Sequence, residues 1–338
     1  MKGIKLAILG ATGAVGSEML KVLEERKFPI SQLKLLADRS FKGMIIKWNG
    51  EDHVVEEATP SSFEDIDITL SAVGDEVSKM FAPEAVKRGS IVIDNSSAYR
   101  MEPSVPLVVP EINPDDVLNH EGIISNPNCS TIIGLVAVNA LHKYGKIKRM
   151  VVSTYQAVSG AGQLGISELE KQTSQYLNNE ELDINVFQHQ IAYNLIPHID
   201  KFESNGYTKE EMKMLNEGKK ILNDPDIKIN CTCVRVPVFR SHCESITLET
   251  EKKISVEKAL ELLGKAPGVK VVDDIANNQY PMPKDTSGQD IIFVGRVRED
   301  LSSENSLSLW CCGDQIRKGA ATNAVQIAEL LLEKGIVG

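Results

Sequence analysis

A glycine-rich turn near the first residues constrains the fold more than any other feature of the chain. The apolar run Lys5-Leu6-Ala7-Ile8-Leu9 leads directly into Gly10-Ala11-Thr12-Gly13-Ala14-Val15-Gly16, where an amphipathic helical pattern begins. This order predicts a strand, a tight turn and a helix whose N-terminus stabilises a bound pyrophosphate. The spacing is GxxGxxG instead of the commoner GxGxxG, and a purely structural turn also uses such glycines. We interpret the turn as a dinucleotide site with contacts at Gly10, Thr12, Gly13, Ala14 and Val15.

The next predicted strand bears on which dinucleotide fits. Leu33-Lys34-Leu35-Leu36-Ala37-Asp38 ends where the cofactor ribose lies in a doubly wound fold. Asp38 at the strand end would favour NAD, whereas Arg39 and Ser40, with Lys42 beyond them, suit a 2′-phosphate. A solvated turn would also explain Arg39. We expect NADP, bound in part by Arg39 and Ser40, while Asp38 keeps NAD open.

The rest of the chain predicts two domains. Apolar runs at 68–73 and 91–93, with a helix at 83–88 between them, extend a parallel, Rossmann-like sheet. From 150 onward, longer alternating runs predict half-buried strands at 150–156, 229–236, 245–249 and 291–295, hence an α+β domain with a mixed or antiparallel sheet. A helix is expected from Ile316 to Leu332. We expect a dinucleotide-binding domain at 1–128 plus 316–338, and a catalytic and dimerisation domain at 129–315, as a length of 338 residues allows.

Composition and charge exclude several classes of function. A net charge of −10 and the lack of a basic, aromatic-rich stripe argue against nucleic acid. No apolar run approaches the ~18 residues of a membrane span, and the first residues lead straight into a strand without a signal peptide. Six cysteines form neither a CxxC pair nor a disulfide framework. We expect a cytoplasmic protein with no bound metal.

Cys129 is the candidate nucleophile. It lies in Asn126-Pro127-Asn128-Cys129-Ser130-Thr131, just before an apolar helical run that continues to Leu141. A thiol at the positive end of a helix is stabilised as the thiolate, the form that attacks carbonyl carbon. A small buried core residue is the alternative, since most free cysteines are of that kind.

Three polar residues of the second half are expected to meet Cys129. Gln156 ends a predicted strand, and Arg235 and His242 lie seven residues apart in Arg235-Val236-Pro237-Val238-Phe239-Arg240-Ser241-His242. A histidine can take and return the proton of a thiol, and the planar fork of an arginine can hold a carboxylate. A lone core histidine and a surface ion pair are the alternatives. With the dinucleotide site, these groups predict hydride transfer to or from a thioester or hemithioacetal.

The motifs together resemble the aspartate-semialdehyde dehydrogenase family along nearly the whole chain. They are GATGAVG at Gly10 to Gly16, SSAYRM at Ser96 to Met101, NPNCST at Asn126 to Thr131, YQAVSGAG at Tyr155 to Gly162, EEMK at Glu210 to Lys213, RVPVFRSH at Arg235 to His242 and RKGAATNAVQ at Arg317 to Gln326. The resemblance implies reduction of L-aspartyl 4-phosphate by NADPH to aspartate 4-semialdehyde and phosphate, at the branch leading to lysine, methionine and threonine.

The resemblance also implies a role for each matched residue. Cys129 would form an acyl-thioester, His242 would be general acid and base, and Gln156 would orient the acyl group. Arg235 would bind the substrate carboxylate and Glu210 its amino group. Phosphate would be bound by Arg100, Asn128 and Lys213, although Lys213 also fits a solvated helix face. Ser159, Gly160 and Gln315 would contact the cofactor, with Gln315 standing where asparagine is usual; its longer amide can make the same hydrogen bonds.

Two rival interpretations remain at this point. N-acetyl-glutamyl-phosphate reductase shares the fold and thiol chemistry but takes a longer, acylated substrate; RVPVFRSH and NPNCST favour the aspartyl enzyme. A non-catalytic relative that keeps the fold for binding is disfavoured by the presence of Cys129, Gln156, Arg235 and His242 together. The resemblance further implies a homodimer or a dimer of dimers, formed through the second domain.

Overall fold

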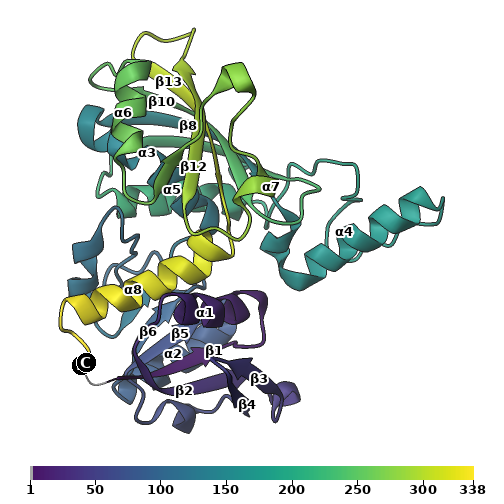
Figure 1. The fold of residues 1–338 in the computed structure, drawn as a ribbon, viewed down its shortest axis with the longest axis vertical. Helices are drawn as coiled ribbons and strands as arrows, with labels where there is room; N and C mark the ends of the chain where they lie inside the picture. Colours follow the sequence, from purple (N-terminus) through teal and green to yellow (C-terminus); the bar gives the residue numbers. More distant parts are fainter. Residues whose placement is uncertain (1–2) are drawn as a thin grey trace. The chain divides into compact units, whose positions relative to one another are not determined.

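The computed structural model describes residues 3–338 and divides into two compact units. Unit 1 comprises Met1–Asn128 and Ala320–Gly338, and unit 2 comprises Cys129–Gly319. Each unit has its own β-sheet, and the chain colours of Figure 1 show that the C-terminal helix belongs with the N-terminal strands of unit 1. No helix within residues 3–338 has the length and apolar character needed to cross a membrane.

Unit 1 contains a seven-stranded sheet. Its strands are β1 (Ile4–Leu9), β2 (Ile30–Ala37), β3 (Ile45–Trp48), β4 (Glu51–Glu57), β5 (Ile68–Ser71), β6 (Ile91–Asp94) and β7 (Ile123–Ser125). They are ordered β3-β4-β2-β1-β5-β6-β7, with β3 and β4 antiparallel and the other neighbours parallel. The helices of this unit are α1 (Ala14–Glu25), α2 (Asp75–Lys87) and α8 (Thr322–Glu333).

Helices cover both faces of this sheet because β1 is apolar on both sides. Ile4, Leu6 and Ile8 are buried in one cluster with residues of α1 and α8, among them Met19 and Ile327. On the other face, Ala7 and Leu9 share a second cluster with Ala82 and Ala85 of α2. A parallel sheet buried on both faces is the expected doubly wound arrangement, so the predicted Rossmann-like domain is confirmed.

Unit 2 contains a six-stranded mixed sheet. Its strands are β8 (Ile147–Gln156), β9 (Lys228–Arg235), β10 (His242–Thr250), β11 (Val269–Val271), β12 (Ile292–Glu299) and β13 (Ser306–Gly313), ordered β11-β12-β13-β10-β8-β9. The pairs β8–β9 and β11–β12 are parallel and the others antiparallel. Its helices are α3 (Cys129–Gly145), α4 (Gly162–Leu177), α5 (Lys209–Ile221), α6 (Val256–Gly264) and α7 (Pro283–Thr286). The predicted α+β domain with a mixed sheet is confirmed.

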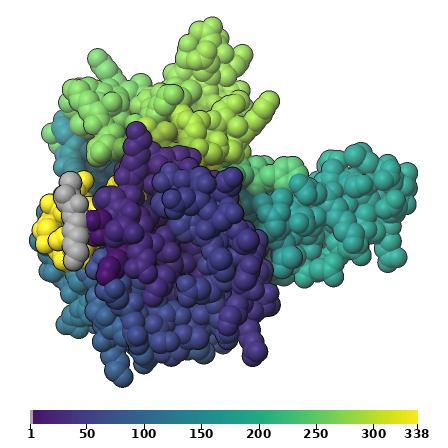
Figure 2. All heavy atoms as spheres, turned by 60° about the horizontal axis from the view of Figure 1, so that its bottom comes forward, coloured from purple at the N-terminus to yellow at the C-terminus, as the bar shows by residue number. Residues whose placement is uncertain are grey.

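Two helices of unit 2 have opposite surroundings. Twelve of the 17 residues of α3 are buried, and the helix packs against β10, β12 and β13 of the sheet. In contrast, α4 extends away from that sheet in Figure 1, and in Figure 2 its teal side chains stand out from the green part of unit 2. Large apolar side chains such as Leu164 and Leu177 are exposed on it.

Two predicted helices have different bounds in the structure. The helix expected at 83–88 is too short, because α2 begins at Asp75 and contains Pro83 in its interior. The carboxylates of Asp75 and Glu76 favour the helix N-terminus, and packing of Ala82 and Ala85 outweighs the hydrogen bond that Pro83 cannot donate. The helix expected from Ile316 begins instead as a short π-helix, Arg317–Ala321, before α8.

Candidate active site

The glycine-rich turn of unit 1 forms a close backbone turn between β1 and α1. Gly10 has φ of +88°, and a Cβ there would lie 2.5 Å from the carbonyl oxygen of Ala72. A Cβ on Gly16 would lie 2.2 Å from the carbonyl oxygen of Gly10, so the helix packs closely on the turn. Gly13 precedes α1 and has no side chain to cap it, while Ala14 and Val15 begin the helix. The N–H groups of the first turn are therefore available to an anion.

A cavity of about 480 Å³ adjoins this turn in unit 1. Its lining includes Gly10, Thr12 and Gly13, the charged side chains Asp38, Arg39 and Glu57, and apolar side chains from α2 and from the segment after β2. The Asp38 carboxylate accepts hydrogen bonds from the backbone N (2.9 Å) and Oγ (2.7 Å) of Ser40, and these bonds lower the pKa of Asp38. The cavity fits a dinucleotide, because it offers glycines for the pyrophosphate, apolar side chains for a base and the exposed Arg39.

Arg100 is fixed at the carboxyl ends of two parallel strands of unit 1. Its Nε donates to the carbonyl oxygen of Asn126, 3.0 Å away, and its Nη2 donates to that of Asn95, 2.7 Å away. Asn95 directly follows β6 and Asn126 directly follows β7. Asn128 is also buried in this unit. Two of the three predicted phosphate ligands thus belong to unit 1.

Cys129 is the first residue of α3 in unit 2. The other five cysteines are buried, whereas Cys129 is partly exposed. A Cβ on Gly319 would lie 2.9 Å from Cys129 Cβ, so the segment before α8 passes close to the candidate nucleophile and leaves little room for a side chain. The position at the helix N-terminus and the partial exposure are those of a reactive thiol. They disfavour the alternative of a core cysteine.

Gln156 and Arg235 are paired at the ends of the parallel strands β8 and β9. The Gln156 Nε2 donates to Ser130 Oγ at 2.8 Å and to Glu210 Oε1 at 3.2 Å. Gln156 therefore bridges the first turn of α3, beside Cys129, and the first turn of α5. Both Gln156 and Arg235 are buried.

His242 is the first residue of β10 and is fully buried. Its Nδ1 accepts a hydrogen bond from the backbone N of Ala157 at 3.0 Å, so the neutral ring carries its hydrogen on Nε2. Burial lowers the pKa of His242 well below its ordinary value, and the nearby Arg235 charge lowers it further. A Cβ on Gly160 would lie 3.4 Å from His242 Nε2 and 2.7 Å from Arg235 Nη1. Gly160 thus lies against both predicted site residues.

Lys213 bridges two carboxylates near Gln156. Its Nζ lies 3.1 Å from Glu210 Oε2 and 3.1 Å from Asp200 Oδ2. Burial lowers the pKa of Lys213, but the two carboxylates outweigh burial and the net shift is upward, so the ammonium stays charged. Lys213 is held in this triad and is not part of a fully solvated helix face.

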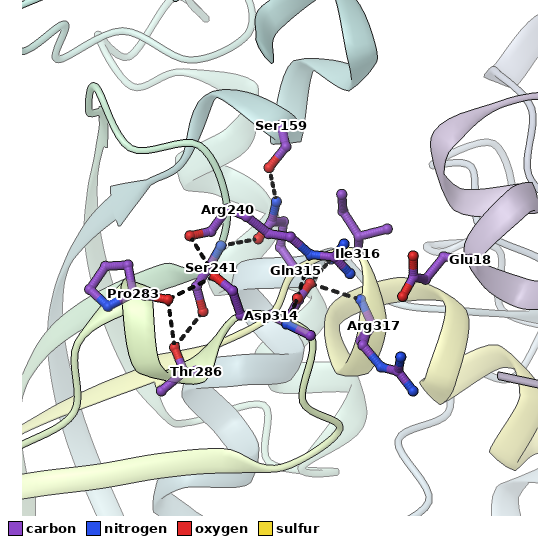
Figure 3. Close-up of polar contacts among 12 residues, drawn as sticks. Glu18, Ser159, Arg240, Ser241, Pro283, Thr286, Asp314, Gln315, Ile316 and Arg317 are labelled. Atoms are coloured by element: carbon purple, nitrogen blue, oxygen red, sulfur yellow. Dashed lines mark hydrogen bonds and ion pairs between the residues drawn. The ribbon is translucent and has the colours of Figure 1, made fainter. Parts of the chain in front are cut away.

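Ser159 and Gln315 lie together in unit 2, as Figure 3 shows. The Gln315 Oε1 accepts from the backbone N of Ser241 at 2.9 Å, and its Nε2 donates to Ser159 Oγ. The neighbouring Asp314 accepts hydrogen bonds from the backbone N of Ile316 (2.9 Å) and of Gly288 (2.6 Å), which fixes the segment that carries Gln315. The two ends of the Gln315 amide therefore link Ser159 to Ser241, the residue before His242.

Several groups at the site were not predicted from the sequence. Ser130 follows Cys129 directly, so its position beside the nucleophile was a usable signal. Asp200 binds Lys213 from the loop before α5, and the backbone N–H of Ala157 fixes the ring of His242. Neither contact leaves a signal in the sequence, because Asp200 belongs to no periodic element and Ala157 contributes only its backbone.

Comparisons with known proteins identify the family of the chain. Residues 5–120 match the family model "Semialdehyde dehydrogenase, NAD binding domain", and residues 138–318 match "Semialdehyde dehydrogenase, dimerisation domain". The chain is 53% identical to an aspartate-semialdehyde dehydrogenase of Aquifex aeolicus (strain VF5), over 99% of this chain and 100% of the relative.

Solved structures give the same result. The structure of aspartate semialdehyde dehydrogenase II from Vibrio cholerae, complexed with ASA, matches with a TM-score of 0.96 and 45% identity, over 98% of this chain and 99% of that one. The Candida albicans enzyme, solved with NADP, matches with a TM-score of 0.76 and 25% identity, over 99% and 100% of the two chains. The chain therefore belongs to the aspartate-semialdehyde dehydrogenases, NAD(P)-binding oxidoreductases of amino-acid biosynthesis.

Proposed function

We propose that the chain reduces L-aspartyl 4-phosphate to L-aspartate 4-semialdehyde and phosphate with NADPH, through a thioester on Cys129. The observation that carries the proposal is the arrangement in unit 2. A partly exposed thiol, Cys129, starts α3. Gln156 ends β8, Arg235 ends β9 and His242 begins β10, and these three strands are adjacent in the sheet.

Cys129 is the nucleophile of the proposed reaction. Its thiolate attacks the acyl carbon of the substrate, the carbon–oxygen bond to phosphate breaks, and phosphate leaves as an acyl-thioester forms. Bound NADPH supplies the hydride that reduces the thioester carbon. The resulting hemithioacetal then breaks its carbon–sulfur bond, which releases the aldehyde and returns the thiolate.

His242 is the proposed acid–base group. Because the Ala157 N–H occupies Nδ1, the neutral ring offers Nε2–H as a donor to the oxygen of the hemithioacetal as negative charge develops there. Accepting the Cys129 proton at Nε2 would require the ring to change tautomer and break the Ala157 bond. While the Ala157 bond is intact, His242 can therefore donate a proton at Nε2 but cannot accept one there.

The substrate's charged groups have proposed partners. Arg235 binds the carboxylate with its planar fork, Glu210 binds the amino group, and Gln156 orients the acyl group. Arg100, Asn128 and Lys213 bind phosphate. The raised pKa of Lys213 supports its role, since the ammonium stays positive throughout the neutral range.

We assign NADP as the preferred cofactor. Arg39 is exposed beside the cavity next to the glycine-rich turn and can pair with a 2′-phosphate, while Asp38 is turned toward Ser40. The Candida albicans relative was solved with NADP. Ser159, Gly160 and Gln315 would contact the nicotinamide end.

We also propose that the enzyme is a cytoplasmic homodimer or dimer of dimers. Unit 2 largely coincides with the match to a dimerisation domain, and α4 of this unit exposes large apolar side chains. All six cysteines are free thiols, as is usual in a reducing compartment.

One absorbance assay tests the reaction, the cofactor and the substrate class. NADPH formation would be followed with aspartate semialdehyde, phosphate and NADP, then with NAD, and then with N-acetyl-glutamate semialdehyde. We expect phosphate-dependent NADPH formation with the aspartyl substrate alone. Activity only with the acetylated substrate would transfer the assignment to the related reductase, and inactivity with both would indicate a binding protein.

A further inference from the structure

The Arg235 guanidinium makes a hydrogen bond on one side only. Its Nη1 donates to the carbonyl oxygen of Ala157 at 2.7 Å, and this is its one side-chain hydrogen bond within residues 3–338. A Cβ on Gly160 would lie 2.7 Å from the same Nη1, so the turn after β8 presses on this side of the group. The remaining N–H groups of the fork are those that a substrate carboxylate would use.

An aromatic ring covers Arg235 from another direction. The Cζ atom of Arg235 lies 5.8 Å from the centroid of the Phe187 ring, within the range of a cation–π contact. A Cβ on Gly165 of α4 would lie 3.2 Å from Phe187 Cζ. The ring therefore lies close to both the backbone of α4 and the guanidinium.

The backbone that carries Phe187 is fixed by a buried carboxylate. Glu168 of α4 accepts hydrogen bonds from the backbone N of Asn185 (2.9 Å) and Val186 (2.5 Å) through Oε2, and from that of Phe187 (3.3 Å) through Oε1. One turn further along α4, Gln172 Oε1 accepts from the backbone N of Ile191 at 2.9 Å. These bonds order a segment that has no helix or strand of its own.

The same segment also holds the main chain of Arg235. The backbone N of Ile196 donates to the carbonyl oxygen of Arg235 at 3.0 Å, and the backbone N of Arg235 donates to that of Ile196 at 2.8 Å. Residues 185–196 thus contact Arg235 twice, through its backbone and through its side chain.

We propose that Phe187, held by Glu168, is a positioning residue that fixes the Arg235 guanidinium for the substrate carboxylate. The proposal rests on the proposed function, in which Arg235 binds that carboxylate. A free arginine side chain loses rotamer freedom when it binds a ligand, and a fork already fixed by a carbonyl and a ring loses less. Phe187 therefore acts on substrate binding and not on hydride transfer.

The test is steady-state kinetics of the full-length enzyme in the direction of semialdehyde oxidation. Phe187→Leu keeps apolar volume and removes the ring, and we expect it to raise KM for aspartate semialdehyde about 3- to 30-fold. We expect kcat and the KM values for phosphate and NADP to change less than about 3-fold. Glu168→Gln should act in the same direction with a smaller effect, and Phe202→Leu, at an exposed ring of unit 2, should behave like the wild type.

A double-mutant cycle with Arg235→Lys separates the possible outcomes. In the Arg235→Lys background, Phe187→Leu should add less than about 2-fold to KM, because the two residues act as one unit. If Arg235→Lys raises KM and Phe187→Leu does not, the positioning role is wrong and the proposed function stands. If Phe187→Leu raises the KM for all three substrates alike, the ring is only structural. An unchanged KM in Arg235→Lys would instead remove the carboxylate role of Arg235.

Discussion

Cys129 differs from the five buried cysteines in its partial exposure and in its position at the first residue of a helix. It begins α3, whose N-terminal end favours an anion through the helix dipole, and its thiolate would interact with the positive charge of Arg235, as would that of the buried Cys233. Burial lowers the pKa of Arg235, while the Glu210 carboxylate and the Cys129 thiolate oppose that shift. The attraction is reciprocal, so the guanidinium that would bind substrate also favours the reactive form of the thiol.

Replacing the thiol tests the covalent mechanism. We expect Cys129→Ala to lower kcat by more than about 1,000-fold, because no other nucleophile can form the thioester. The affinity for NADPH, measured by fluorescence titration, should stay unchanged. Cys231→Ala, at a buried thiol of β9, is the matched control and should keep near-normal kcat. Appreciable turnover by the Cys129 variant would remove the covalent mechanism.

The cofactor preference is expected to depend on one exposed arginine. Arg39→Ala should weaken NADPH by about 10- to 100-fold, the range for losing a charge-assisted bond to phosphate, and should leave NADH almost unaffected. Dissociation constants for both cofactors, taken from fluorescence titration, provide the measurement. Equal losses for NADPH and NADH would show that the 2′-phosphate is bound elsewhere. Lys47→Ala, on β3 of the same unit, is the control for a general loss of positive charge.

At the scale of elements, α3 and β10 meet over a buried carboxyl group. Glu244 lies two residues after His242 on β10, and a Cβ on Gly134 of α3 would come within 2.5 Å of its Oε2. Neither carboxyl oxygen has a hydrogen-bond partner among residues 3–338, and burial raises the pKa of Glu244 well above its ordinary value. The native state therefore keeps this group protonated and neutral.

This carboxyl group makes stability depend on pH. The unfolded chain loses the Glu244 proton near pH ~4.3, whereas the native state retains it, so the unfolded state binds fewer protons above that pH. The free energy of unfolding then falls by up to about 1.4 kcal/mol per pH unit until the native pKa is reached. Glu244→Gln removes this loss. We expect the gain in stability of the variant over the wild type to be larger at pH 7 than at pH 5.

Denaturation midpoints at the two pH values measure that difference. Glu249→Gln is the matched control, because it lies at the other end of β10 and pairs with Lys148 at the surface. A gain of equal size at pH 5 and pH 7 would mean that Glu244 is ionised in the native state.

The sequence predicted elements where one periodic pattern dominated. The strands ending at Leu9 and Asp94 and the buried helix after Cys129 were found because their apolar residues are consecutive. The hairpin of β3 and β4, closed by Asn49 and Gly50, is mostly exposed and carries no such run.

The site was predictable only in part, for a related reason. Cys129 and His242 belong to short motifs, whereas Glu168 and Phe187 contribute through backbone and ring contacts to residues far along the chain. Such contacts depend on packing, which no local pattern records.

At the scale of the whole molecule, two peptide bonds join the units, Asn128–Cys129 and Gly319–Ala320. Within unit 2, the residues that end these connections touch, since Gly319 faces Cys129. Cys129, the proposed nucleophile, therefore lies where the chain enters unit 2 and directly beside where it leaves. Substitution of Gly319 by a larger residue would displace the Cys129 side chain.

The exposed face of α4 indicates how a second copy of the chain would bind. Leu164 is 71% exposed and Leu177 is 68% exposed at the two ends of this helix. The burial of each leucine is worth about 1.5–3 kcal/mol, so we expect Leu164→Lys with Leu177→Lys to weaken the proposed dimer by at least about 100-fold. Sedimentation velocity over a dilution series measures the dissociation. Leu301→Lys, at a fully exposed leucine outside α4, should leave the dimer intact. A dimer of unchanged stability in the α4 variant would place the interface on another surface of unit 2, and the exposed leucines of α4 would then need a different partner.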